Sequence, residues 1–340
     1  MGKTIFIIAI IILLTILTYT FIKIYLNYKV NCLLEKYEIK CKNISIPGPS
    51  LGLILDAKII CNKLPLLDEL LGNKNIIIEN SGSPKPEDII FVNLDWTDFK
   101  NLKRDSAPKT ILCKTKQCYD ILKNNFKNKK VIYTGFTSID RFKTGYSIDY
   151  NKWIHICGKS PYKGTIQLVK TWIQHPEFPL LTIKVYDSVY NEIQKIIKNK
   201  TVTNLEINNN FITDEEVDIL YNTYGVHICP SNQEGWGHYI AEAKACRAVV
   251  LYTDAPSMNE TFIDGYDGIA IRCNLNTNKK INDICPFYEL EEKDIAIAVQ
   301  KTLNLTLQQK QDIGKNARNS FLENDTQFTK RLNNALTEDT

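Results

Sequence analysis

The chain opens with an uninterrupted apolar segment and then changes to short apolar runs that alternate with amphipathic segments. Residues 4–22 carry no charge, and nineteen residues at a rise of about 1.5 Å each span roughly 28 Å. This length approaches the ~30 Å hydrocarbon core of a bilayer and exceeds the apolar part of a cleaved signal peptide. We therefore expect a single transmembrane helix through residues 4–22, within an anchor of residues 1–27.

Positive charges flank this segment and are more numerous after it. Lys3 precedes it, and five lysines from Lys23 to Lys42 follow it. The positive-inside rule then predicts a single-pass membrane protein with its body in the cytoplasm, and a luminal body is the alternative. Residues 28–50 are polar and end in a turn rich in Pro and Gly, which predicts a linker.

The first part of the body shows short apolar runs bounded by turn residues, which is typical of strands buried on both faces of a sheet. Two longer segments between these runs have the spacing of helices. We expect strands at 52–55, 75–79, 88–93, 109–113 and 130–134, and helices at 64–71 and 115–126.

From residue 151 onward, strand and helix patterns alternate regularly. Such βαβα alternation predicts a parallel, doubly wound sheet, because each crossover helix must cover a sheet face. Thr213 and Glu216 form a capping-box pattern at the start of one helix. We expect strands at 153–157, 181–186, 204–207, 226–229 and 248–252, and helices at 164–175, 188–199, 238–247 and 305–336.

Composition agrees with an ordinary globular chain. Of 340 residues, 44% are hydrophobic and 24% charged, which excludes a disordered or fibrous protein, and a net charge of +4 is too small to indicate a nucleic-acid partner. The ten cysteines form no CxxC pair and no Cys/His cluster with zinc spacing. Cys157, Cys229 and Cys246 lie in apolar runs and are expected to be buried, and we expect reduced cysteines.

Candidate chemistry lies in residues 226–260. A buried strand is followed by the loop Glu234-Gly235-Trp236-Gly237, and a helix then begins near His238. In a parallel sheet such a loop lies at the carboxyl edge, where ligands bind. Glycines let backbone N–H groups approach an anion, and the helix N-terminus adds partial positive charge. The segment therefore predicts a site for a diphosphate.

Two carboxylates, Glu234 and Glu242, flank this predicted anion site. Carboxylates repel phosphate, so they are expected to accept hydrogen bonds from hydroxyl groups, and a ligand with both features is a nucleotide sugar. A Gly-x-Gly before a helix and two glutamates eight residues apart are also common by chance, so the pattern alone leaves an ordinary structural loop as the alternative.

The ten residues from Glu234 to Ala243 resemble the E-x7-E motif of retaining GT-B glycosyltransferases, that is, glycosyl transferases group 1 of the family 4-like type. The flanking segments 213–221 and 245–254 resemble the elements before and after that motif. The similarity covers residues 150–335. It implies that Glu242 holds the ribose of the nucleotide, that Glu234 binds the transferred sugar, and that Gly235, Trp236, Gly237 and His238 contact sugar and diphosphate through their backbone.

A second segment, residues 158–164, resembles the family's Gly-Arg-x4-Lys-Gly element, with Lys159 in place of the arginine. The resemblance implies that Lys159 and Lys163 neutralise charge on the leaving diphosphate, and that Ser160 belongs to the same donor-binding loop. The alternative interpretation is that both lysines lie in an ordinary loop exposed to solvent. His155 and His227 lie in apolar strand patterns and are expected to be core residues, as are Trp153 and Trp172.

The resemblance also implies an α/β fold with two Rossmann-like domains, the GT-B architecture. The N-terminal acceptor domain, residues 51–145, is reduced and contains no histidine, which the family often has near its reaction centre. The nucleotide-sugar domain follows at 146–310, and a C-terminal helix at 311–340 returns to the first domain. No metal and no cofactor is expected, because the nucleotide sugar is the substrate.

We therefore expect a membrane-anchored glycosyltransferase. It would move a hexose-type sugar from a nucleotide sugar to an unknown acceptor (glycan, lipid or protein), with retention of configuration. The main alternative is a catalytically silent protein that keeps the GT-B fold and binds nucleotide sugars or serves as a scaffold. An unrelated nucleotide-binding oxidoreductase is disfavoured, because no GxGxxG follows an early strand.

Overall fold

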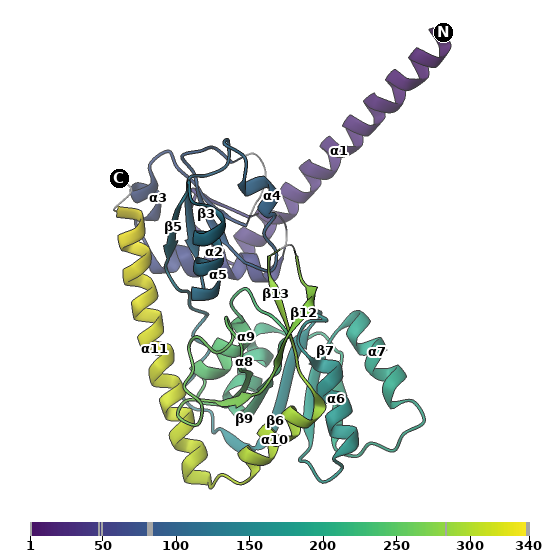
Figure 1. Cartoon of the computed structure of the whole chain (residues 1–340), viewed down its shortest axis with the longest axis vertical. Coiled ribbons are helices and arrows are strands. Elements are labelled where there is room, and N and C mark those ends of the chain that lie inside the picture. Colours follow the sequence, from purple (N-terminus) through teal and green to yellow (C-terminus); the bar gives the residue numbers. More distant parts are fainter. Residues whose placement is uncertain (1, 47, 49, 80–83, 283, 338–340) are drawn as a thin grey trace.

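The computed structural model describes residues 2–46, 48, 50–79, 84–282 and 284–337; the side chains of residues 1–10 and 13 lie outside this description. Two α/β domains lie one above the other, and a long N-terminal helix projects from the upper one (Figure 1). The predicted α/β architecture with parallel sheets is confirmed.

Helix α1 (Gly2–Lys36) leaves the body, and the described large apolar side chains between Ile11 and Leu26 are exposed. Its last turns pack on the first domain through Val30 and Leu33. The predicted span at 4–22 falls on α1, partly on residues whose side chains are not described. Within the described part of the chain, no helix has both the length and the hydrophobicity that crossing a membrane requires. The predicted transmembrane helix is therefore not supported.

The first domain holds a five-stranded parallel sheet in the order β1-β2-β3-β4-β5. Every residue of β2 and β3 is buried, because helices or loops cover both faces of the sheet. The strands are β1 (Ile44–Ser45), β2 (Ile76–Ile78), β3 (Ile89–Val92), β4 (Thr110–Cys113) and β5 (Lys130–Tyr133), and the helices are α2 (Leu51–Lys63), α3 (Leu67–Leu71), α4 (Phe99–Leu102) and α5 (Lys116–Asn125).

The beginning of this domain differs from the prediction. Residues 52–55, predicted as a strand, form the first turns of α2, and the predicted linker at 28–50 contains both the end of α1 and strand β1. Helix α2 is buried on most of its surface, including Asp56 at 1% exposure. When a helix is buried on nearly all sides, its apolar residues no longer repeat with the helical period. The apolar pattern of its sequence then cannot be distinguished from that of a buried strand.

The second domain holds a six-stranded parallel sheet in the order β11-β10-β9-β6-β7-β8. The strand order reverses between β6 and β9, and a crevice for ligands is expected beyond the carboxyl ends of these two strands. The strands are β6 (Asp149–Gly158), β7 (Leu181–Val185), β8 (Leu205–Asn208), β9 (Tyr224–Cys229), β10 (Val249–Thr253) and β11 (Ile269–Ile271).

Helices cover this sheet on both sides, and Trp153 and Trp172 lie fully buried between sheet and helix, which confirms them as core residues. The predicted capping box is present, since the Thr213 hydroxyl accepts a hydrogen bond from the Glu216 N–H and the Glu216 carboxylate accepts one from the Thr213 N–H. The helices are α6 (Thr165–Gln174), α7 (Asp187–Ile197), α8 (Asp214–Thr223), α9 (His238–Ala245) and α10 (Glu292–Leu303).

Two elements after the second sheet join the domains. Helix α11 (Leu307–Thr337) runs along both, with Ile313 in the core of the second domain and Phe328 in that of the first (Figure 1). A hairpin of β12 (Asn274–Lys280) and β13 (Pro286–Glu289) reaches the first domain. There Cys285 packs in the first-domain core, and the Asn282 amide donates a hydrogen bond to the Leu94 carbonyl over 2.8 Å.

A carboxylate of the second domain caps a helix of the first. Glu260, in the loop after β10, accepts hydrogen bonds from the backbone N–H groups of Lys116 (2.6 Å) and Gln117 (2.8 Å). These are the first two residues of α5, whose donors have no partner within the helix. The Gln117 side chain also donates to the Tyr288 hydroxyl over 2.9 Å. The two domains thus contact each other through specific polar groups.

Cysteine pairing departs from the prediction at one place. Cys41 and Cys61 form a disulfide between the segment before β1 and helix α2, which brings together residues 20 apart in the sequence. The expectation of reduced cysteines is wrong there, because sequence spacing does not reveal that α2 folds back beside this segment. Cys157, Cys229 and Cys246 are free and buried, as predicted.

Candidate functional site

Two loops meet at the point where the strand order reverses. The loop after β6 ends at Gly164, and the loop after β9 begins at Pro230. Gly164 has φ +63°, and a Cβ there would collide with the Pro230 carbonyl oxygen. The Asn232 N–H donates a hydrogen bond to the Tyr162 carbonyl over 2.8 Å. Glycine is therefore required at position 164 both by its backbone conformation and by the close approach of the loops.

Lys163 and Glu234 lie side by side across these two loops. Lys163 Nζ is 2.5 Å from Glu234 Oε1, and the two side chains are only 16% and 11% exposed. The Ser231 hydroxyl also bonds Glu234 Oε1 at 2.5 Å and contacts the Tyr239 hydroxyl at 2.6 Å, while Lys163 Nζ lies 3.9 Å from the centre of the Tyr239 ring. The Glu234 carboxylate is thus fixed by a cation and a hydroxyl.

Helix α9 begins directly after this cluster. Its N-cap is Gly237, with φ +85°, and no side chain caps the helix there. Backbone N–H groups and the positive end of the helix dipole therefore face the region beside Glu234, which suits an anionic group.

The first side chain of α9 contacts the opposite domain. His238 Nε2 lies 3.0 Å from Asp56 Oδ1, and His238 Nδ1 lies 3.0 Å from Ser138 Oγ. Asp56 also pairs with Lys114, and both side chains are at most 2% exposed. Burial alone would raise the pKa of Asp56, but Lys114 and His238 bring it below its usual value. The imidazole of His238 is therefore engaged by the first domain.

Trp236 likewise faces the first domain. Its indole N–H donates a hydrogen bond to Ser138 Oγ over 3.0 Å, and its ring packs edge-on against Phe136 at 5.9 Å. Gly235 lies against the same domain, because a Cβ there would come within 2.5 Å of Asp95 Oδ1 and 2.8 Å of Asn93 Oδ1. The loop that follows β9 is thus pressed against the first domain over two successive residues.

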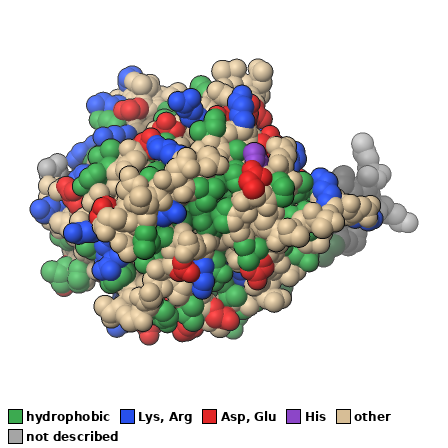
Figure 2. All heavy atoms as spheres, turned by 90° about the horizontal axis from the view of Figure 1, so that it is seen from below, with side chains coloured by type: hydrophobic (Ala, Val, Ile, Leu, Met, Phe, Trp, Pro, Cys, Tyr) green, Lys and Arg blue, Asp and Glu red, His purple; other side chains and the backbone are tan. Residues whose placement is uncertain are grey.

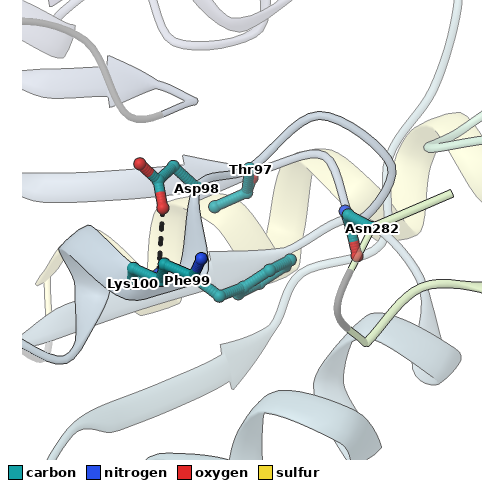
Figure 3. A pocket seen from close by; sticks show the side chains of 5 residues that line it. All are labelled: Thr97, Asp98, Phe99, Lys100 and Asn282. Carbon is teal, nitrogen blue, oxygen red and sulfur yellow. Dashed lines mark hydrogen bonds between the residues drawn. The ribbon is translucent and has the colours of Figure 1, made fainter.

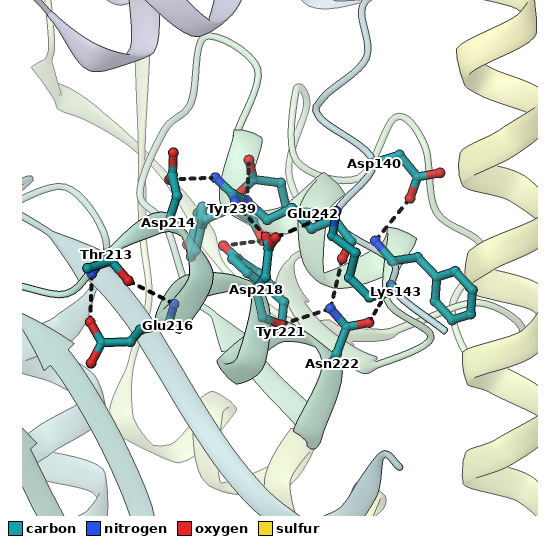
Figure 4. A network of polar contacts seen from close by, with 12 residues as sticks. Asp140, Lys143, Thr213, Asp214, Glu216, Asp218, Tyr221, Asn222, Tyr239 and Glu242 are labelled. Carbon is teal, nitrogen blue, oxygen red and sulfur yellow. Dashed lines mark hydrogen bonds and ion pairs between the residues drawn. The ribbon is translucent and has the colours of Figure 1, made fainter. Parts of the chain in front are cut away.

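Glu242 lies one turn further along α9, among the polar contacts drawn in Figure 4. Its Oε1 is 3.2 Å from Arg141 Nε, and Arg141 Nη1 donates to Asp218 over 2.8 Å. Burial opposes the charge on Arg141, yet the neighbouring Glu242 and Asp218 raise the pKa of the guanidinium above its ordinary value. The structure therefore places Glu242 with Arg141, and its described polar contacts do not include Lys163 or Glu234.

Lys159 and Ser160 do not join the Lys163–Glu234 cluster. Lys159 Nζ pairs with Asp187 at 2.8 Å on the surface, with 75% of its side chain exposed. Ser160 Oγ accepts a hydrogen bond from the Tyr162 N–H over 3.3 Å, which shapes the loop. In this structure Lys159 corresponds to a solvated surface lysine.

The two strand histidines are buried and neutral. His155 lies 2.7 Å from the Ile228 carbonyl and 2.9 Å from the Thr165 hydroxyl, and burial lowers its pKa to about 4. His227 stacks on Tyr221 with 5.2 Å between ring centres, and burial lowers its pKa to about 3. Both are core residues, as expected from their strand patterns.

A shallow pocket of about 260 Å³ lies where α4 meets the β12–β13 hairpin (Figure 3). Several of its polar groups hold the local structure. Asp98 caps α4 by accepting from the Lys100 N–H, and Asn282 donates to Leu94 while accepting from the N–H groups of residues 284 and 285. None of the predicted site residues lines this pocket.

Several residues of the site were not singled out in the sequence. Ser231 and Tyr239 stand inside the analysed segment, and their hydroxyls could have been noted as neighbours of Glu234. Arg141 lies 101 residues before its partner Glu242, and Asp56 and Ser138 lie 182 and 100 residues before their partner His238. None of the three carries a local signal. Only the packing of the two domains brings them to the site.

Comparison with known proteins agrees with this geometry. The family model of glycosyl transferases group 1 matches residues 139–320. A glycosyltransferase from Methanocaldococcus jannaschii, described as uncharacterized, is 26% identical over 198 residues, which are 58% of this chain and 52% of that protein. The chain thus spans about half the length of this curated relative.

Solved structures show the same fold. A glycosyltransferase from Rickettsia africae superposes with a TM-score of 0.60 at 15% identity, over 87% of this chain and 89% of that one. HepE from Anabaena, determined in complex with UDP and glucose, superposes with a TM-score of 0.57 at 14% identity, over 91% and 81%. Since the family model covers more than half of the sequence, this chain belongs to the glycosyl transferases group 1 family.

Proposed function

We propose that this protein is a glycosyltransferase that moves a sugar from a nucleotide sugar to an acceptor. The observation that carries the proposal is the Lys163–Glu234 pair, held at 2.5 Å beside the uncapped start of α9. It lies at the reversal of strand order, where doubly wound folds bind nucleotides. The structure of HepE with UDP and glucose, which has the same fold, supports a nucleotide sugar as the partner.

The proposed roles follow from charge. The diphosphate of the donor would accept hydrogen bonds from the backbone N–H groups at 235–238, and Lys163 would neutralise the charge that develops on the leaving group. Glu234, once the donor is bound, would accept hydrogen bonds from hydroxyls of the transferred sugar. Glu242 would hold the ribose, positioned by Arg141 at 3.2 Å.

Several finer features rest on the family resemblance. These are a hexose-type sugar, retention of configuration, the roles of the E-x7-E glutamates, and a reaction without a metal or cofactor. A contribution of Lys159 would require it to leave Asp187, which is accessible to solvent and holds it only weakly. Ser160 would act by shaping the same loop.

The test uses the full chain in mild detergent with a panel of UDP-, GDP- and ADP-sugars. Release of nucleoside diphosphate, with water as a slow acceptor, is expected for one donor and should continue in the presence of EDTA. Glu234→Gln and Lys163→Met should remove it, whereas Lys170→Met, an exposed lysine on α6, should not. Donor binding without turnover would indicate the catalytically silent alternative, and no binding to any nucleotide sugar would refute both.

We further propose that α1 attaches the protein to a membrane, on the basis of the uncharged sequence 4–22. The lysines after it favour a cytoplasmic body, whereas a Cys41–Cys61 disulfide is more typical of the luminal side. Sodium carbonate extraction tests the attachment: the full chain should remain in the membrane pellet, and the double variant Ile12→Asp, Leu17→Asp should be released. Protease protection of sealed vesicles then reports the orientation.

A further inference from the structure

Asp95 has an unsatisfied carboxylate oxygen where the first domain packs against Gly235 of the second. It lies in the turn after β3, which is closed by hydrogen bonds from the N–H groups of Trp96 and Thr97 to the Asn93 carbonyl (3.2 and 3.1 Å). Asp95 Oδ1 is shielded from solvent and has no hydrogen-bond partner among the described residues. It lies against the bare face of Gly235, at 2.5 Å from where a Cβ would be.

A buried carboxylate oxygen without a partner is costly, and the described residues supply no donor for it. Burial and the negative charge of Glu234 raise the pKa of Asp95 to about 7, so the carboxyl is partly protonated near neutral pH. The nearby cations are already engaged, Lys114 with Asp56 and Lys163 with Glu234.

The surrounding charge limits the kind of ligand that fits. Two further carboxylates of the first domain, those of Glu79 and Asp56, lie close by. The Asn93 amide joins them, because it donates to Glu79 over 2.8 Å and to Asp56 over 3.4 Å. A phosphate or carboxylate placed beside Asp95 would meet this negative charge. A neutral ligand with hydroxyl groups satisfies Oδ1 without that repulsion.

The next residue provides an apolar surface. Trp96 is 74% exposed, whereas the other three tryptophans of the chain are at most 8% exposed. An exposed indole on the residue that follows Asp95 in the chain offers an apolar surface, and Asp95 offers a hydrogen-bond acceptor. A saccharide ring presents the matching C–H face and hydroxyl groups.

We propose that Asp95 and Trp96 form the acceptor subsite of this protein and that the acceptor is a neutral saccharide. Asp95 accepts a hydrogen bond from an acceptor hydroxyl next to the sugar held by Glu234, and Trp96 stacks on the acceptor ring. The assignment of this ligand as an acceptor rests on the proposed function. Saccharide binding itself does not require turnover.

The experiment therefore measures binding and transfer separately. Saturation-transfer NMR on the full chain, with a panel of methyl glycosides and disaccharides, reports saccharide binding with and without UDP. We expect at least one saccharide to bind, and Trp96→Ala and Asp95→Ala each to weaken it by 10-fold or more. Trp96→Phe should retain most of the affinity. Tyr146→Ala and Asp105→Asn, at exposed positions, are the matched controls.

Transfer assays with the saccharide that binds complete the test. Asp95→Ala and Trp96→Ala should each raise the acceptor KM at least 10-fold. Trp96→Ala, which changes an exposed side chain, should keep donor hydrolysis by water within 3-fold of wild type. If wild type binds no saccharide, or if polyprenyl phosphate in micelles binds in a Trp96-dependent way instead, the proposal is refuted. Saccharide binding that depends on Trp96 without any nucleotide-sugar turnover would keep the subsite and refute only the proposed transfer.

Discussion

His238 and Asp56 join the two domains through a hydrogen bond of 3.0 Å, although 182 residues separate them in the sequence. Asp56 at the same time neutralises Lys114 in a site at most 2% exposed. The start of the helix proposed to face the diphosphate is thus held by a buried ion pair of the other domain. Damage to that ion pair should therefore affect both stability and donor binding.

Asp56→Ala leaves Lys114 buried without its carboxylate. We expect the free energy of unfolding to fall by about 3–5 kcal/mol, because an uncompensated buried charge is costly. The double variant Asp56→Leu, Lys114→Met should recover most of this loss. Urea denaturation followed by circular dichroism measures both, with Asp105→Ala as the control; equal losses for the single and double variants would contradict the assignment.

Loss of Lys163 should act on chemistry more than on folding. Its ammonium faces Glu234 at the loop junction and is proposed to stabilise the leaving diphosphate, so Lys163→Met should lower kcat by about 100-fold or more. Lys163→Arg should restore only part of the rate, since the fork of a guanidinium differs from a point charge. Single-turnover release of nucleoside diphosphate is the measurement, and an unchanged rate would remove Lys163 from the mechanism.

Arg141 is expected to act through Glu242. Arg141→Ala frees the Glu242 carboxylate from its 3.2 Å contact, and the disordered carboxylate should weaken donor binding by roughly 10-fold. Lys143→Ala, two residues away and with 54% of its side chain exposed, should bind the donor like wild type. Isothermal titration calorimetry with the donor compares them. Equal affinity for Arg141→Ala and wild type would show that Glu242 needs no positioning.

Asp95 predicts a pH-dependent effect on stability. Its pKa is raised to about 7 in the fold, against about 3.9 in an unfolded chain. Between these values the folded state binds the extra proton, so wild-type stability falls as pH rises from about 4 to 8. Asp95→Asn lacks this loss. Its Tm relative to wild type should therefore rise by at least about 2 °C between pH 4.5 and pH 8, as measured by scanning calorimetry. A Tm difference independent of pH would contradict this.

The second domain could be predicted from sequence because its signals are local. Strand and helix patterns alternate there with short connections, and Gly164, Glu234, Gly237 and Glu242 stand within those connections. The structure places Lys163 and Glu234 together, and the sequence analysis assigned both to the donor site only through the family resemblance. The first domain was harder, because α2 is buried on most sides and its apolar run at 52–55 has no periodicity that separates helix from strand.

Most contacts between residues far apart in the sequence could not be predicted. The Arg141–Glu242 pair, the engagement of His238 by Asp56 and the Cys41–Cys61 disulfide each join residues from segments whose relative placement is set by long-range packing. No spacing rule encodes such placement. The sequence analysis assigned the backbone of Trp236 and His238 to the ligand and did not foresee that their side chains contact the first domain.

The cap that Glu260 places on α5 has a consequence for how substrates enter. If the domains separate, Lys116 and Gln117 lose the carboxylate that accepts from both of their amides, and α5 keeps only its own Thr115 hydroxyl as a cap. Opening the crevice would then loosen the first turn of a first-domain helix. Fraying of α5 would thus accompany each cycle of substrate entry and product release, and hydrogen exchange at those two amides would report the open population directly.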